Sequence, residues 1–120
     1  MLIAVTGVSL LRIVEPEVVI LGGPEMFVET GSIINLTCSI SWTPAPPLHT
    51  SWTHNNSNIS YRGPRPGVSL IVDKSEVTIV QLIIISARST DSGVYTCSPD
   101  NGPSAELRLH VLTGETAAQY

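Results

Sequence analysis

The residues with the clearest chemical capacity in this sequence are two cysteines and three asparagines. Cys38 and Cys97 suit either one disulfide or two free thiols. Asn-x-Ser/Thr sequons without a central proline begin at Asn35, Asn55 and Asn58, and such sequons accept N-glycans in secreted proteins. Together they favour the secretory route, where oxidising conditions permit disulfides. We therefore expect a Cys38–Cys97 bond, which closes a loop of about 60 residues and contributes roughly 4 kcal/mol to stability. We also expect Asn55 and Asn58, which share one loop, to carry a single glycan between them.

Histidine is the other residue type that could do chemistry, and its three copies are His49, His54 and His110. They are far apart in the sequence, and no His-Glu-x-x-His, Cys-x-x-Cys or Gly-x-Ser-x-Gly motif accompanies them. Structural or solvent-facing roles are therefore favoured over catalysis. Asp91 and Tyr95 could also suggest a catalytic pair, but the fold considered below accounts for both. We expect no enzyme, metal, cofactor or small-molecule substrate.

The composition narrows the class of protein further. The chain of 120 residues has 42% apolar residues and a formal net charge of −4, which suits one self-folding domain. Its six lysines and arginines are scattered, so the sequence lacks the cluster of basic residues that is typical of nucleic-acid-binding proteins. No window reaches the roughly 20 apolar residues of a membrane span. Attachment to a membrane would therefore depend on parts outside this chain.

The elements that must position these residues are strands, because apolar residues recur at every second position. Residues 33–40 place Asn35 on the outer face, and residues 105–111 place His110 there. Turn-forming segments lie at 43–47, 54–58, 62–67 and 98–103, the last as a hairpin turn rather than a recognition loop. About seven or eight short strands indicate an all-β sandwich. The expected inward residues are Ile34, Leu36, Cys38, Ile40, Val80, Leu82, Ile84, Ala105, Leu107, Leu109 and Val111.

A tryptophan and a tyrosine complete a specific pattern around the two cysteines. Trp52 follows Cys38 in a separate strand, and Tyr95 lies two residues before Cys97. This order predicts an immunoglobulin sandwich whose Tyr95 forms a tyrosine corner. The inward Leu82-x-Ile84 strand fits the same core.

An acidic residue completes the same corner. Asp91 stands at the turn that enters the Tyr95 strand, and its expected partner is Arg65, with Arg62 as the other candidate. The short segment between the cysteines favours an I-set or C2-like sandwich, with two antiparallel sheets joined by one disulfide, over a full variable domain.

Longer runs carry a closer resemblance, which covers residues 15–118. They are "ILGGPEMFVETGSIINLTCSIS", "PPLHTSWTHN" and "VDKSEVTIVQLIIISARSTDSGVYTCSPDNGPSAELRLHVLTGE". These resemble the second immunoglobulin domain of the arthropod defective proboscis extension response family. The resemblance implies a neuronal surface protein with two immunoglobulin domains, anchored by a lipid or a span, which recognises proteins on other neurons and helps specify synapses. It also implies that the first domain makes the partner contact.

The two ends of the chain differ from that pattern. Residues 1–14 resemble the last strand of a preceding domain or a linker, and a signal peptide is the alternative for this apolar segment. Residues 15–113 are the expected immunoglobulin-like domain and residues 114–120 a C-terminal tail, in which no anchor signal is recognised. We expect a fragment of a longer product whose partner-binding first domain lies outside it.

One apolar stripe indicates a contact surface. If Val80 faces inward, then Ile79, Ile83 and Ile85 face outward along the same strand, with Val77 and Ile33 as further members. The mean hydropathy of +0.25 is high for a soluble domain, so the stripe is a candidate interface with a domain, a second copy or a partner. The alternative is a register shift by one residue, which would exchange the two faces.

The function expected from these features is recognition or adhesion at the cell surface, outside the cell. The chain would space or support a partner-binding first domain in a neuronal receptor that contacts other immunoglobulin-superfamily proteins. The alternative is a secreted single-domain immune or decoy receptor that binds a ligand through its loops.

Overall fold

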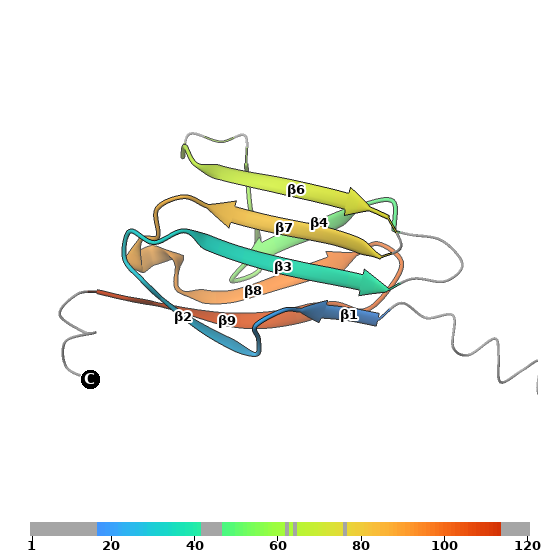
Figure 1. Ribbon diagram of the computed structural model, residues 1–120, viewed down its shortest axis with the longest axis horizontal. Helices are drawn as coiled ribbons and strands as arrows, with labels where there is room; N and C mark the ends of the chain where they lie inside the picture. Colours follow the sequence, from blue (N-terminus) through green and yellow to red (C-terminus); the bar gives the residue numbers. More distant parts are fainter. Residues whose placement is uncertain (1–16, 42–46, 62, 64, 76, 114–120) are drawn as a thin grey trace, which may run out of the picture.

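The computed structural model describes residues 17–41, 47–61, 63, 65–75 and 77–113. Within these ranges nine strands form two sheets that pack face to face (Figure 1). One sheet has the order β1 (Glu17–Ile20), β3 (Ile34–Ser41), β7 (Thr78–Ile84) and β6 (Val68–Lys74). The other has the order β2 (Glu25–Glu29), β9 (Ala105–Leu112), β8 (Gly93–Pro99), β4 (Thr50–His54) and β5 (Ser57–Asn58). The predicted all-β sandwich is confirmed.

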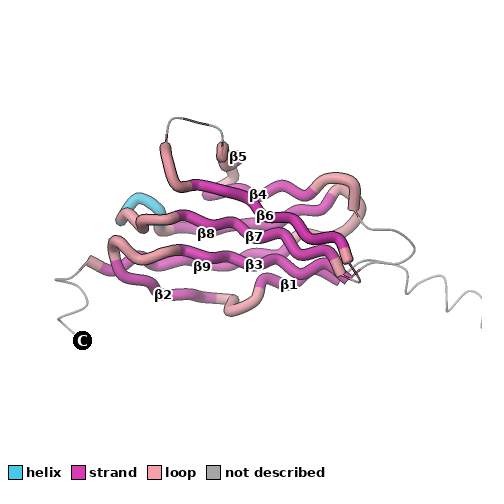
Figure 2. The backbone as a smooth tube through the Cα atoms, turned by 45° about the horizontal axis from the view of Figure 1, so that its top comes forward, coloured by secondary structure: helices cyan, strands magenta, loops and turns pink. Residues whose placement is uncertain are grey.

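The first two strands lie in different sheets. β1 is antiparallel to β3, whereas β2 is parallel to β9. The five-stranded sheet is therefore mixed, and the expectation of two purely antiparallel sheets is wrong at this edge, because the chain crosses between the sheets after β1 and so reaches β9 in the parallel sense. The short connection between them leads the chain from one layer to the other (Figure 2), and it contains a cis peptide bond between Gly23 and Pro24. The backbone N–H of Arg108 donates to the carbonyl oxygen of Pro24 at 2.8 Å, which fixes the start of β2 beside β9. Both sheets therefore gain an edge strand from one stretch of chain.

The core forms where the alternation predicted it. Each expected inward residue from β3, β7, β8 and β9 is buried, except that Ala105 is only partly buried. Burial of these side chains between the two sheets supplies the hydrophobic stabilisation. Because Val80, Leu82 and Ile84 are buried, the predicted register of β7 is confirmed, and its outward positions are Ile79, Gln81 and Ile83.

The chain enters and leaves the sandwich at opposite ends. Glu17, the first residue of β1, pairs with Ser41 at the end of β3. The carbonyl oxygen of Leu112, the last residue of β9, accepts a hydrogen bond from the backbone N–H of Thr30, shortly before the start of β3. The length of β3 separates the two ends by about 25 Å, and Figure 1 shows them at opposite sides of the molecule.

Some sequence predictions fall outside the described residues. They concern residues 1–14 and 114–120, most of the turn at 43–47, and Arg62. Two differences from the prediction concern strand number. Residues 17–29 form two strands, and a two-residue turn at Asn55 and Asn56, both with positive φ, adds the short β5, as expected for a tight hairpin.

Gly93 opens β8 at a point where two neighbouring side chains leave no room for a Cβ atom. Its φ is 141°, and a Cβ atom there would lie 2.5 Å from Oδ1 of Asn55 and 2.8 Å from Nε2 of His54. Gly93→Ala should therefore lower the free energy of unfolding by about 2 kcal/mol, measured by urea denaturation.

Gly31 provides the matched control for this substitution. It also has a positive φ, 89°, but a Cβ atom there would meet nothing within 4 Å. Gly31→Ala should cost only the backbone strain, about 1 kcal/mol. Equal losses for the two variants would show that contact with Asn55 and His54 does not matter.

Candidate functional site

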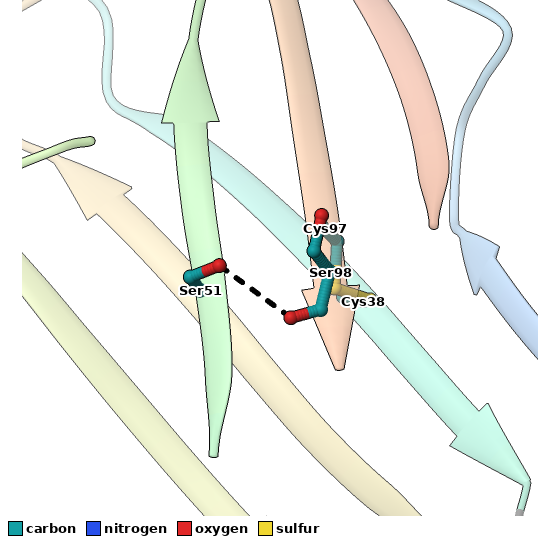
Figure 3. Close-up of a disulfide and its surroundings, with 4 residues drawn as sticks. All are labelled: Cys38, Ser51, Cys97 and Ser98. Atoms are coloured by element: carbon teal, nitrogen blue, oxygen red, sulfur yellow. Dashed lines mark hydrogen bonds between the residues drawn. A yellow bond between two sulfur atoms is a disulfide. The ribbon is translucent and has the colours of Figure 1, made fainter. Parts of the chain in front are cut away.

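The disulfide joins the centres of the two sheets. Cys38 on β3 and Cys97 on β8 are bonded, with their Cα atoms 6.4 Å apart, and both are fully buried. Trp52 on β4 pairs in register with Cys97 and is also buried. Figure 3 shows the bond beneath β8, with the Ser51 hydroxyl donating to the carbonyl oxygen of Ser98 at 3.5 Å. The predicted disulfide is confirmed, and its role is to hold the two sheets together.

Asp91 and Tyr95 form the corner that leads into β8. The Tyr95 hydroxyl donates to the carbonyl oxygen of Asp91 at 2.6 Å. The Asp91 carboxylate accepts two hydrogen bonds from the guanidinium of Arg65, one of them at 2.8 Å, and another from the backbone N–H of Arg88 at 2.7 Å. Arg65 also donates to the carbonyl oxygen of Ser86. These contacts tie the β6 side of one sheet to β8 of the other.

The electrostatics of this corner favour the charged pair. Burial of the Asp91 carboxyl acts to raise its pKa, but the hydrogen bonds from Arg65 and from the backbone of Arg88, with the charge of Arg65, outweigh burial and lower that pKa below its usual range. Burial raises the pKa of the Tyr95 hydroxyl well above its ordinary value. Asp91 is therefore an ionised structural anchor at neutral pH.

The three histidines lie in three different surroundings. His54 stacks on Tyr95, with ring centroids 4.5 Å apart, and its Nε2 lies 2.9 Å from the carbonyl oxygen of Ser92. His49 is exposed, and His110 lies on the opposite side of the sheet from Tyr95. Among the described residues, no three His, Cys, Asp or Glu side chains gather as a metal would require. The observed contacts of His54 and His110 are structural.

A small cluster on β2 and β9 was not predicted. Phe27 stacks on His110 with ring centroids 4.5 Å apart, and Nε2 of His110 lies 2.8 Å from Oε1 of Glu25. Phe27 is 61% exposed, so this cluster stands on the outer surface of the five-stranded sheet. The sequence placed His110 outward, but only the parallel pairing of β2 with β9 brings Glu25 and Phe27 beside it.

The four-stranded sheet presents the apolar stripe that the sequence indicated. Ile79 and Ile83 are half-buried on its outer face, and Ile85 is 53% exposed. Register places Asn35 of β3 directly beside Ile83. Ile85 lies just beyond the end of β7, and Ile33 just before β3 is also exposed. The predicted glycan acceptor and the predicted interface residues thus share one surface.

The other two sequons lie at the opposite sheet. Asn55 closes the turn between β4 and β5, where its Oδ1 accepts a hydrogen bond from the backbone N–H of Val94 at 2.9 Å. Asn58 is exposed on β5. Neither contacts the apolar stripe, because β5 is at the far edge of the five-stranded sheet.

A cleft opens between β4 and the edge strand β6. Its volume is about 200 Å³, and Trp52, Tyr61, Leu70 and Leu82 contribute to its walls. The indole N–H of Trp52 has no hydrogen-bond partner among the described side chains and backbone groups. The cleft is smaller than the roughly 300–1,000 Å³ of typical ligand pockets, so it does not indicate a small-molecule site.

Over the described ranges, no helix is long and apolar enough to span a membrane.

The sequence matches one family model, and the fold matches several solved structures. A family model described as an immunoglobulin domain matches residues 15–101. No curated protein matches the sequence. Among solved structures, the Ig1–Ig2 chain of Dpr2, crystallised in complex with Ig1–Ig3 of DIP-Theta, is similar with a TM-score of 0.73 and 22% identity. The match covers 82% of this chain and 50% of that chain, so the present chain spans about half the length of the Dpr2 chain.

Two single domains are similar over nearly their whole length. The first immunoglobulin domain of the mouse polymeric immunoglobulin receptor gives a TM-score of 0.64 at 20% identity, covering 82% of this chain and 96% of that one. The ZIG-8 IG1 homodimer structure gives 0.59 at 20% identity, covering 94% and 99%. At these identities the three likenesses concern the fold.

Proposed function

Because the chain belongs to the immunoglobulin domain family, we propose that it is a recognition and adhesion module of a neuronal cell-surface receptor. In this proposal it spaces and supports a partner-binding immunoglobulin domain on its N-terminal side, and it contributes to synaptic partner specification. It acts through protein contacts made outside the cell, and not through catalysis.

The observation that carries this proposal is the placement of the two ends. β1 begins at one end of the sandwich and β9 finishes at the other. A domain with this geometry holds its neighbours in line, so it adds its own length between them. The proposed boundaries follow: residues 15–113 form the spacing domain, residues 1–14 belong to a preceding strand or linker, and residues 114–120 are a tail.

The comparisons support the choice of partner class. Dpr2 was solved in complex with another protein of immunoglobulin domains, and ZIG-8 IG1 as a homodimer. The Cys38–Cys97 disulfide suits an extracellular environment. We therefore propose immunoglobulin-superfamily surface proteins as partners, contacted mainly through the neighbouring domain.

Surface plasmon resonance with the Ig1–Ig3 ectodomain of DIP-Theta as the probe tests this assignment. Residues 1–120 alone should give no saturable binding at tens of micromolar, because the spacing domain does not carry the main contact. Dpr2 Ig1–Ig2 is the positive control.

Sequencing of transcripts across the codon for Met1 should reveal an upstream coding region with a further Cys, Trp and Cys set.

Strong binding by residues 1–120 alone would contradict the spacing role. It would favour the alternative of a secreted single-domain receptor that binds a ligand through its own loops. A transcript that truly starts at Met1 would point the same way, and ligands would then be sought at the loops of this domain.

A further inference from the structure

The outer face of the four-stranded sheet carries little charge. Its outward positions on β3 and β7 are uncharged, and its charged side chains, Glu17 and Asp73, lie on the edge strands. Near the sheet margins, Val19 is 46% and Ile71 is 47% exposed. The outward residues of β3 itself are polar, so the apolar side chains of this face lie on β7, just before β3 and at the margins. A group of exposed apolar side chains of this kind marks a contact surface. The outward apolar residues on or beside this face are Val19, Ile33, Ile71, Ile79, Ile83 and Ile85.

A sequon lies within this face. Asn35 is exposed on β3, beside Ile83 of β7. Its Oδ1 accepts hydrogen bonds from the Thr37 hydroxyl at 3.3 Å and from Nε2 of Gln81 at 3.4 Å. Its Nδ2 has no hydrogen-bond partner among the residues that the structure describes. The amide is thus held through its oxygen while its nitrogen, the atom that a glycan would occupy, is unengaged.

We propose that an N-glycan on Asn35 covers the apolar row of Ile33, Ile83 and Ile85 and so closes this face to flat protein docking. Transfer from a lipid-linked pyrophosphoryl oligosaccharide forms a bond between Nδ2 and C1 of the first N-acetylglucosamine. The bond from C1 to the pyrophosphate oxygen breaks, the lipid pyrophosphate leaves, and Nδ2 gives up one proton. The C–H faces of the sugar then pack on the aliphatic side chains beneath.

The strand order fixes when this modification happens. β3 is hydrogen-bonded to β1 on one side and β7 on the other, and Leu36, the middle residue of the sequon, is fully buried. The folded strand therefore cannot enter an enzyme active site as a free extended peptide. The acceptor is the unfolded nascent chain, and folding then places the glycan over the sheet.

The geometry favours a glycan over a protein as the occupant of this face. A glycan on Asn35 would stand directly beside Ile83, so a flat partner surface would meet it before reaching Ile83. The uncharged centre of the face offers no charge complementarity to a protein. At Asn55, by contrast, both ends of the side-chain amide have neighbours. Its Oδ1 accepts a hydrogen bond from the backbone N–H of Val94, and its Nδ2 lies 3.4 Å from Nε2 of His54.

The first test measures occupancy in the full chain, secreted from eukaryotic cells behind a cleavable leader. Enzymatic release of N-glycans in heavy-oxygen water converts each occupied asparagine to labelled aspartate, which peptide mass spectrometry locates. We expect label at Asn35 in most molecules. Thr37→Ser should keep the label and Thr37→Val should remove it, because only the hydroxyl completes the sequon. Secreted, folded protein with unlabelled Asn35 would overturn the proposal.

The second test asks whether the glycan covers the face. Secreted Asn35→Gln, with circular dichroism matching the wild type, should self-associate at least several-fold more strongly in sedimentation equilibrium. Adding Ile83→Thr to this variant should reverse the gain. Unchanged self-association, or protein docking on this face of the glycosylated chain that Ile83→Thr abolishes, would overturn the covering role. Neither result depends on binding to DIP-Theta, so this proposal and the spacing function fail separately.

Discussion

Replacing Cys38 and Cys97 together by alanine is expected to lower the free energy of unfolding by about 4 kcal/mol. The bond links β3 to β8 across the core, and it restricts the unfolded chain by closing a loop of about 60 residues. Urea denaturation followed by tryptophan fluorescence measures the loss. The slope of the transition should also increase, because an unfolded chain without the link exposes more surface to urea.

The wild-type protein under reducing conditions is the matched control. A thiol-free reductant should bring its transition close to that of the double variant, and it should leave the variant itself unchanged. If the reduced wild type kept its full stability, the link would contribute nothing, and the sandwich would be held by packing alone.

Asp91→Asn is expected to cost about 3 kcal/mol at neutral pH. The substitution removes the carboxylate that Arg65 and the backbone N–H of Arg88 bind, and the side chain of Asp91 is only 5% exposed. Asp91 is buried and Arg65 is about a quarter exposed, so the substitution leaves a partly buried guanidinium and the backbone N–H of Arg88 without the carboxylate that compensates for their lost hydration. The exposed pair of Glu25 and His110 provides the control, because Glu25→Gln should change stability by less than about 1 kcal/mol.

The difference between wild type and Asp91→Asn should also depend on pH. The folded pKa of Asp91 is lowered, so the unfolded state binds the proton more readily. The contribution of the carboxylate is therefore complete above the unfolded pKa of about 4, and it is lost as the pH falls through the lower folded value. Urea midpoints at pH 7, 5, 4 and 3 should converge for the two proteins at the acid end. A constant difference across this range would contradict an ionised Asp91.

The sequence predicted the centre of this fold better than its edges. β3 and β7 are covered on their inner faces by the other sheet. The alternation of apolar and polar residues along these strands therefore predicts which side chains are buried. Asp91 and Tyr95 could be placed because the turn before β8 constrains them locally. Edge strands lack such a constraint. Val72 of β6 pairs with the buried Val80 but is 49% exposed, because its strand lies at the sheet margin.

The pairings that sequence reasoning missed are those between distant segments. Periodicity places Phe27 and His110 on strand surfaces, but it does not say that β2 lies parallel to β9. That register depends on the crossing at Gly23 and Pro24, which moves the chain to the second sheet. The outward histidine was foreseen, whereas its contacts with Phe27 and Glu25 required the three-dimensional arrangement.

The parallel pairing of β2 with β9 also determines how the domain bears tension. A pull on the two ends of the chain draws β2 and β9 in opposite directions along their common axis. The hydrogen bonds between them are then loaded together in shear, and they cannot open one after another as in an unzipping hairpin. If that pair yields, the Cys38–Cys97 bond still keeps the chain between the cysteines from extending. A pull on the two ends of the chain would therefore stretch this domain only at its margins.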